Sequence, residues 1–326
     1  MAAAPESTRK EKILDSDDAK QFRASAFLII QETVKLKERV LLDEILHSIF
    51  FLGRIYTPRQ PPEVIVNDKE MLEKLKKLFP RPFEFYSSQL PQRSPFSCVL
   101  DMIVTQAEDR EDENQIIRKL QEFIRQLSLG IKKHLEWLGL NDKTRLEQLG
   151  LGKVQDLVSS TICVSQIPNS VRYYGVSMST KGRNPGRIMV AASCLKTWDS
   201  CVANAVMTYY PQDRMSSFDG TLQLEGHVRC QAFRIRDGSE LPPCKSCQEL
   251  FGLETTDIKN WPYGNCAEAE SLSNLFKKEE EFKKNVQPAN YTEENRTTAE
   301  SDVQEYLEQT LRVVQFKWTK NYYVPQ

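Results

Sequence analysis

Three cysteines and one glutamate lie close together in the sequence between positions 244 and 268. Two residues separate Cys244 from Cys247, 18 separate Cys247 from Cys266, and Glu268 follows two positions later. Three thiolates can hold one Zn²⁺ ion tetrahedrally and leave its fourth position to water. A carboxylate that is not itself a ligand can carry protons to and from that water. The spacing therefore predicts a hydrolytic zinc site with Glu268 as the proton shuttle.

Both halves of this motif are expected at the start of a helix. Cys244 follows Pro243, and a helical pattern continues beyond Cys247, while Cys266 leads directly into a second helical pattern over 267–276. A helix N-terminus and a bound metal ion both lower the pKa of a nearby thiol. We therefore expect two helix starts to point at one metal ion.

Three residues just before Cys266 are candidates for substrate binding. Trp261 and Tyr263 can stack on a planar base, or they can simply pack the loop. Asn265 can hydrogen-bond a substrate hydroxyl group, or it can occupy a turn. The sequence leaves both interpretations open.

At these residues the chain resembles the cytidine deaminase-like superfamily of zinc-dependent nucleoside and nucleobase deaminases. The signature of that family is [HC]-x-E at one helix start and P-C-x-x-C at another. By resemblance, Cys266, Cys244 and Cys247 would bind Zn²⁺ and Glu268 would be the general acid and base. The implied reaction is hydrolytic deamination, in which zinc-activated water attacks the amine-bearing ring carbon and ammonia leaves. In this chain P-C-x-x-C precedes C-x-E, the reverse of the family's order.

A structural zinc site is the main alternative. Cys230 could join Cys244, Cys247 and Cys266 in a closed Cys₄ centre, or His227 could take the place of Cys230. The protein would then be a non-enzymatic interaction protein, or a degenerate deaminase fold, with its N-terminal helices binding a partner protein. The other four cysteines are expected to be small buried hydrophobic residues; these are Cys98, Cys163, Cys194 and Cys201.

Composition restricts the compartment and the partners. The 326 residues have a formal net charge of -1, so no global basic field predicts a nucleic-acid partner, and a nucleobase, a nucleoside or a nucleic acid all remain open. No apolar run approaches the roughly 20 residues that cross a bilayer, and the N-terminus has no signal-peptide core. Eight cysteines are too few for a disulfide-stapled secreted domain. We expect an intracellular protein, cytoplasmic or nuclear, without a membrane partner; its oligomeric state is open.

The N-terminal half has the apolar spacing of helices. This spacing predicts one or two helices from Ala19 to about Phe50, and further helices over 68–79, 112–138 and near 142–160. The stripe over 112–138 is the clearest, because apolar residues recur along one face and mostly polar residues fill the gaps. We therefore expect an all-α domain over 1–160.

The C-terminal half has a mixed pattern. Predicted strands over 171–180 and 187–194 are joined by a turn at 181–186, and a third strand is predicted over 227–236. Helices are predicted over 196–210, 267–284 and 299–315, followed by a docked aromatic tail. This alternation predicts an α/β, deaminase-like zinc domain over 161–326, with a central sheet flanked by helices.

Overall fold

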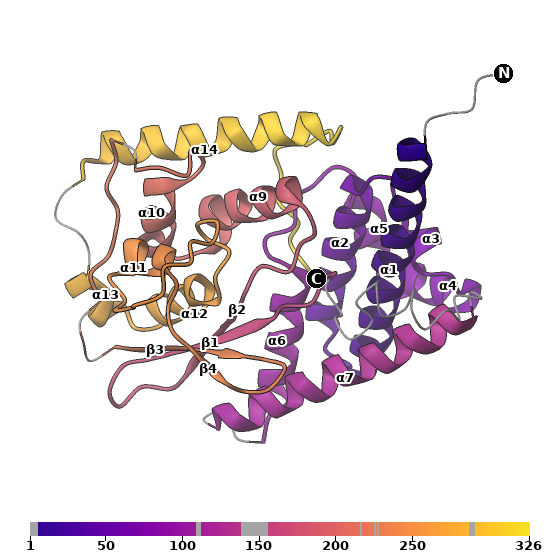
Figure 1. Ribbon diagram of the computed structural model, residues 1–326, viewed down its shortest axis with the longest axis horizontal. Coiled ribbons are helices and arrows are strands. Elements are labelled where there is room, and N and C mark those ends of the chain that lie inside the picture. Colours follow the sequence, from indigo (N-terminus) through magenta and orange to yellow (C-terminus); the bar gives the residue numbers. More distant parts are fainter. Residues whose placement is uncertain are drawn as a thin grey trace.

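A computed structural model describes residues 6–108, 112–137, 156–215, 217–224, 226, 228–286 and 291–326. Helices make up the N-terminal part, and a small sheet with further helices makes up the C-terminal part (Figure 1). This agrees with the coarse prediction of a helical part followed by a mixed part. The N-terminal helices are α1 (Glu6–Leu36), α2 (Arg39–Ile55), α3 (Pro62–Ile65), α4 (Lys69–Leu78), α5 (Pro80–Phe85), α6 (Pro95–Thr105) and α7 (Glu113–Trp137).

Local sequence explains where several of these helices begin. The Asp68 carboxylate accepts a hydrogen bond from Met71 N at the start of α4, and the Ser94 hydroxyl does the same for Ser97 N at the start of α6. These side chains satisfy backbone N–H groups that have no partner within the helix. The predictions over 68–79 and 112–138 are confirmed as α4 and α7, whose apolar stripe is buried from Ile116 to Ile131.

The C-terminal part contains four strands and six α-helices in the described ranges. The elements are β1 (Thr161–Gln166), β2 (Tyr173–Val176), α9 (Arg183–Ala192), a π-helical turn (Ser193–Thr197), α10 (Ser200–Tyr209), β3 (Arg229–Arg234), β4 (Glu240–Leu241), α11 (Lys245–Phe251), α12 (Ala267–Phe276), α13 (Glu280–Val286) and α14 (Glu293–Val313). The described helices and strands therefore alternate only loosely, and helices outnumber strands.

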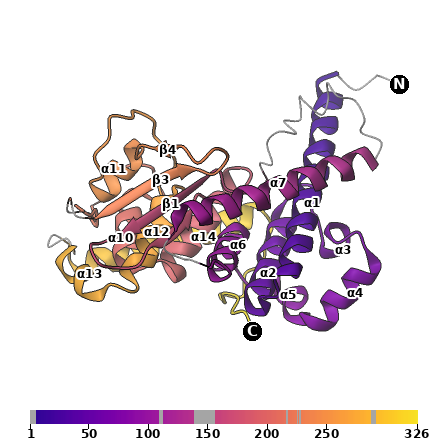
Figure 2. The ribbon, with the colours of Figure 1, turned by 90° about the horizontal axis from the view of Figure 1, so that it is seen from below.

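The sheet has the strand order β2-β1-β3-β4, and every pair is antiparallel. Helix α12 packs along one face of β1 and β2, so closely that a Cβ atom at Gly175 would clash with the backbone of Ser271 and Ala267. Helix α7 passes the other face, where Arg229 on β3 pairs with Glu113 (Figure 2). The sheet is thus held between α12, which carries the candidate site, and the N-terminal helices.

Two sequence predictions about the sheet are wrong. The segment predicted as a strand over 187–194 lies in helix α9 and the start of the π-helical turn that follows it. Ile188 to Ala192 are all buried, and a helix buried on every side loses the periodicity that identifies it. Strand β1 was not predicted, although it lies at the centre of the sheet. It begins at Thr161, where the expected helix near 142–160 would end; residues 142–155 of that prediction lie outside the described ranges.

The remaining strand predictions are confirmed with shorter bounds. Strand β2 lies within 171–180 and β3 lies within 227–236. The single helix predicted over 267–284 is divided into α12 and α13, because the helix ends at Phe276 and restarts at Glu280. The division changes nothing at the Cys266 end of α12.

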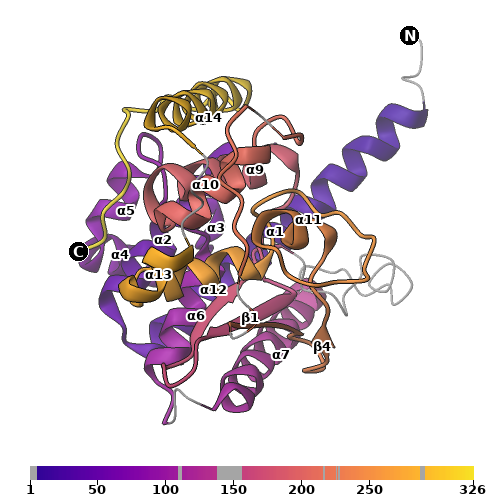
Figure 3. The same ribbon diagram turned by 90° about the vertical axis from the view of Figure 1, so that its left-hand side faces the viewer.

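The C-terminal tail packs against the N-terminal helices, as predicted. Leu90 forms a β-bridge with Tyr322, and the Tyr323 ring stacks on His47 with a centroid separation of 3.8 Å. The Tyr323 hydroxyl donates a hydrogen bond to Asp43 Oδ1 (2.5 Å). Figure 3 shows the tail running down beside α2 and α5. Buried residues from both halves form one continuous cluster, and the domain boundary near 160 stays a prediction.

Within the described ranges, no helix combines the length and the apolar character required to cross a membrane.

Candidate metal centre

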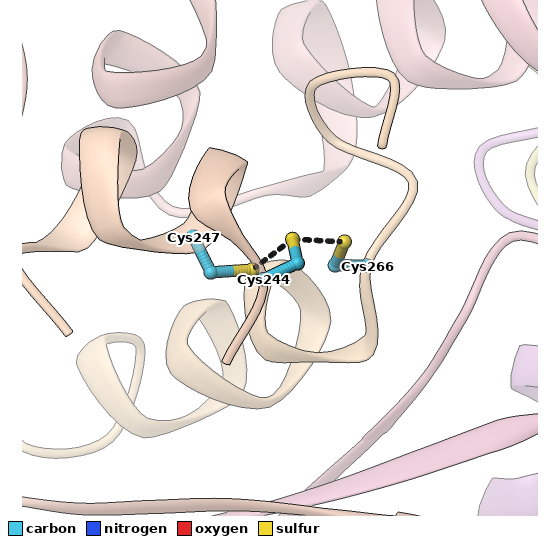
Figure 4. Close-up of side chains that lie close together, drawn as sticks. All are labelled: Cys244, Cys247 and Cys266. Carbon is cyan, nitrogen blue, oxygen red and sulfur yellow. Dashed lines mark hydrogen bonds between the residues drawn. The ribbon is translucent and has the colours of Figure 1, made fainter. Parts of the chain in front are cut away.

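Cys244, Cys247 and Cys266 come together at the starts of two helices. Cys244 precedes the first residue of α11, Cys247 lies in the first turn of α11, and Cys266 precedes the first residue of α12. The Sγ atom of Cys244 is 3.7 Å from that of Cys247 and 3.5 Å from that of Cys266. Figure 4 shows the three side chains pointing toward one another, with Cys244 in the middle.

This spacing fits one metal ion. The three sulfur atoms all lie within 4.8 Å of one another. Thiolates bound tetrahedrally at about 2.3 Å from one ion are separated by about 3.8 Å, which is close to the two shorter distances here. The cysteines could therefore bind one ion with only small movements of their side chains.

The three thiols share their protons unequally. Hydrogen bonds with Cys247 and Cys266 lower the pKa of Cys244 to about 2, although burial opposes this shift. The same contacts raise the pKa of Cys247 and of Cys266 well above that of a free thiol. The three thiols are therefore coupled, and a metal ion that binds them would displace their protons.

Glu268 lies in the first turn of α12, and its side chain is buried, with 4% of the residue exposed. Burial raises the pKa of its carboxyl group to about 7, and a hydrogen bond with Cys247 partly opposes this rise. A carboxyl group that titrates near neutral pH can both accept and donate a proton during a reaction. Glu268 therefore has the environment expected of a general acid and base.

A cavity of about 470 Å³ opens beside this cluster. Cys244, Cys266 and Glu268 line it, whereas Cys247 is fully buried behind them. Trp261 and Asn265 also line the cavity. Its volume lies within the range of about 300–1,000 Å³ that is usual for small-molecule sites. A ligand in this cavity would therefore lie against both the cysteine cluster and the carboxyl group.

Trp261 forms an outer wall of the cavity and is 56% exposed. Its backbone is tied to α11, because the buried Ser246 hydroxyl accepts a hydrogen bond from Trp261 N (3.1 Å) and donates one to Trp261 O (2.5 Å). The loop that carries Trp261 is therefore held beside the cysteines, while the indole ring stays accessible to a ligand.

Tyr263 and Asn265 have different positions. The Tyr263 ring stacks on Tyr209 with a centroid separation of 4.4 Å, and its hydroxyl donates to Glu249 Oε2 (2.6 Å). Tyr263 does not line the cavity at Glu268; it lines a neighbouring cavity of about 540 Å³. Asn265 lines both cavities, and its backbone carbonyl oxygen accepts a hydrogen bond from Met178 N (2.8 Å). Their roles in substrate binding stay predictions.

Cys230 lies outside the cysteine cluster. Its sulfur atom is 3.6 Å from the Sγ atom of Cys163 on the neighbouring strand β1, and it also accepts a hydrogen bond from Ser165. His227, the other candidate for a fourth ligand, lies outside the described residues. Cys98, Cys163, Cys194 and Cys201 are buried, as predicted.

Sequence reasoning missed two residues that shape the site. Met178 follows β2 and lines the cavity at Glu268, and Ser246 holds the Trp261 loop. Met178 is far from the cysteine motif in sequence, so no spacing could indicate it. Ser246 is one of the two residues between the cysteines of P-C-x-x-C, but no sequence pattern identifies a serine there as a contact of a distant loop.

Comparisons with known proteins found no matching family model, no matching curated protein and no matching solved structure.

Proposed function

We propose that this chain is a zinc-dependent hydrolytic deaminase that acts on a nucleobase or a nucleoside. Cys244, Cys247 and Cys266 would bind Zn²⁺, and Glu268 would transfer protons. The observation that carries the proposal is that the cysteine cluster and a buried carboxyl group face the same cavity.

Zinc is the metal that this donor set suits best. Three cysteine sulfurs favour soft or borderline ions, and a set of three protein ligands is typical of catalytic zinc, whereas closed structural sites have four. When bound in such a site, zinc lowers the pKa of a water molecule to about 7 and so makes it a nucleophile at neutral pH.

The residues of the chain would then perform the proton transfers. Glu268 would accept a proton from water as the oxygen attacks the amine-bearing ring carbon, and would deliver it to the ring nitrogen. A second transfer through Glu268 would protonate the amine, so that the carbon–nitrogen bond breaks. In total, the amine and water become a carbonyl group and ammonia. Trp261 would stack on the base and Asn265 would hydrogen-bond the substrate.

We further propose that residues 161–326 form a deaminase-like domain and 1–160 a helical domain. The reversed order of the two motifs is compatible with this, because a metal site is defined by positions in space. The starts of α11 and α12 converge on one point in either chain order. The eight free cysteines are in keeping with a reducing, intracellular compartment.

Metal analysis and an ammonia-release assay test the proposal. Purified protein is expected to hold one zinc ion per chain, and to release ammonia from at least one member of a panel of cytosine, cytidine, adenine, adenosine and guanine. Glu268→Gln is expected to keep the zinc and lose the ammonia release. Zinc bound without ammonia release from any compound would instead support a structural site in a protein that binds partners through its helices.

A further inference from the structure

The cavity at Glu268, called here the reaction cavity, adjoins the second cavity of about 540 Å³. Met178, Trp261 and Asn265 line both cavities, so the two cavities are neighbours. A base held against Glu268 would leave the second cavity free. The substrate therefore has room to extend past Trp261 and beyond the base.

The second cavity has an uncompensated positive charge. Arg183 and Arg187, both on α9, line it together with Asp213. Arg187 is neutralised, because its Nη2 atom lies 2.5 Å from Asp213 Oδ2. Arg183 has no carboxylate or hydrogen-bond partner among the described residues, and its side chain is exposed at the cavity. One guanidinium group is thus free to bind an anion from the ligand.

The reaction cavity has no comparable excess of positive charge. Lys259 and Asp257 line it together and oppose each other, and Arg234 is paired with Asp237 at 3.3 Å. Glu268 adds a carboxyl group to the lining of the reaction cavity. An anionic group on the substrate is therefore better placed in the second cavity than beside Glu268. Guanidinium groups are well suited to such binding, because their N–H groups match the oxygens of a phosphate in pairs.

We propose that the second cavity binds the phosphate group of a nucleotide substrate, with Arg183 as its ligand, while the base lies against Glu268 in the reaction cavity. Trp261 would stack on the base, and Asn265, which lines both cavities, would lie beside the sugar. This inference rests on the proposed function for the position of the base. It extends that function by naming a phosphorylated substrate, and it assigns a binding role to Arg183.

Binding measurements on the zinc-loaded Glu268→Gln variant test the proposal, because this variant should not consume its ligand. Isothermal titration calorimetry would compare cytidine with cytidine 5′-monophosphate, and adenosine with adenosine 5′-monophosphate. A charged hydrogen bond to Arg183 predicts that the monophosphate of the preferred base binds about 10- to 100-fold more tightly than its nucleoside. Arg183→Ala, made in the same variant, is expected to reduce that ratio to about one.

Arg125→Ala is the matched control. Arg125 is an exposed arginine on α7 that pairs with Glu122 and lines neither cavity, so the ratio should stay unchanged. Equal binding of nucleoside and monophosphate would overturn the proposal, as would a ratio that survives Arg183→Ala. Thermal unfolding of each variant establishes that the comparison is between folded proteins.

Two further measurements separate this proposal from the proposed function. If nucleosides are deaminated, but their monophosphates are neither bound nor deaminated better and show no dependence on Arg183, the phosphate site is wrong and the deaminase stands. If neither nucleosides nor nucleotides release ammonia, while inorganic phosphate binds in an Arg183-dependent manner, the deaminase is wrong and the phosphate site stands. A single-stranded trinucleotide with a central target base identifies the source of the phosphate: tighter binding than the mononucleotide indicates a strand, and weaker binding indicates a free nucleotide.

Discussion

Glu268 and Glu270 lie two residues apart on α12, and their carboxyl groups have similar pKa values. Glu268 is buried and Glu270 is partly exposed, yet burial raises the pKa of each carboxyl group to about 7. They differ in what they face. Glu268 lines the reaction cavity beside the cysteines, whereas Glu270 lines a smaller cavity of about 250 Å³ on the other side of α12.

The two carboxyl groups also differ in their partners. Glu270 Oε2 accepts a hydrogen bond from Val176 N (2.7 Å), and Ser97 and the Arg93 guanidinium lie near enough to favour its charged form. Arg93 itself forms paired hydrogen bonds with Glu44, both of 3.0 Å. Glu270 therefore belongs to a polar network that joins α12 to β2 and the N-terminal helices. A raised pKa alone does not identify a catalytic group. The proposed role of Glu268 rests on its cavity, which is lined by both Cys244 and Cys266, whereas the smaller cavity at Glu270 is lined by Cys266 without Cys244.

The largest effect is expected from the three cysteines that we propose as zinc ligands. Cys247→Ser should abolish stoichiometric zinc binding and lower the melting temperature, since zinc binding to such sites is worth about 10 kcal/mol or more. Cys230→Ser is the control, because Cys230 lies beside Cys163 and outside the cluster, and it should keep one zinc ion per chain. Metal content by mass spectrometry decides the result. Zinc loss in Cys230→Ser would instead indicate the closed Cys₄ site.

The comparison between the two glutamates predicts the second effect. Glu268→Gln should lower kcat about 100- to 10,000-fold, which is the usual contribution of a general acid and base, and should leave the zinc in place. Glu270→Gln should change kcat by no more than a few fold, because the glutamine oxygen can still accept the hydrogen bond from Val176. Ammonia release on the preferred substrate measures both. Equal losses of kcat in the two variants would mean that Glu268 has no catalytic role that Glu270 lacks.

The sequence predicted one side of α12 much better than the other. Cys244, Cys247, Cys266 and Glu268 could be grouped because short spacings at helix starts have a known metal chemistry. The Glu270 network could not be predicted, because Arg93 comes from the segment before α6 and Glu44 from α2, both far away in the chain. Met178 and the second cavity could not be predicted either, because the residues that come together there are far apart in the chain.

The sequence also predicted some elements of the fold well and others poorly. Helices α4 and α7 have one buried and one exposed face, so their pattern identified them. Helix α9 is buried over Ile188 to Ala192 and resembles a buried strand in sequence. The order of strands in the sheet depends on contacts between distant segments and had no local signal.

The third prediction concerns pH and the stability of the metal-free protein. In the folded state burial raises the pKa of the Glu270 carboxyl group to about 7, whereas in the unfolded chain the group loses its proton near its ordinary pKa of 4.5. The folded state therefore binds more protons between these pH values, and stability must fall as the pH rises through this window. Glu270→Gln has no proton to lose, so its unfolding free energy should fall less, by about 2–3 kcal/mol over pH 4–8. Urea titrations at several pH values measure the two slopes. Parallel slopes in the two proteins would mean that Glu270 is ionised in the fold.

The smallest effects on activity and stability are expected from two serines, Ser246 beside the Trp261 loop and Ser97 beside Glu270. Ser246→Ala removes the hydrogen bonds that hold the Trp261 loop, so KM should rise about 3- to 15-fold with little change in kcat. Ser97→Ala removes a contact of Glu270 and should leave KM unchanged, at a cost of about 1 kcal/mol in stability. Steady-state kinetics and urea unfolding separate the two outcomes. A loss of stability in Ser246→Ala without a change in KM would mean that the Trp261 loop supports the fold and does not contact the substrate.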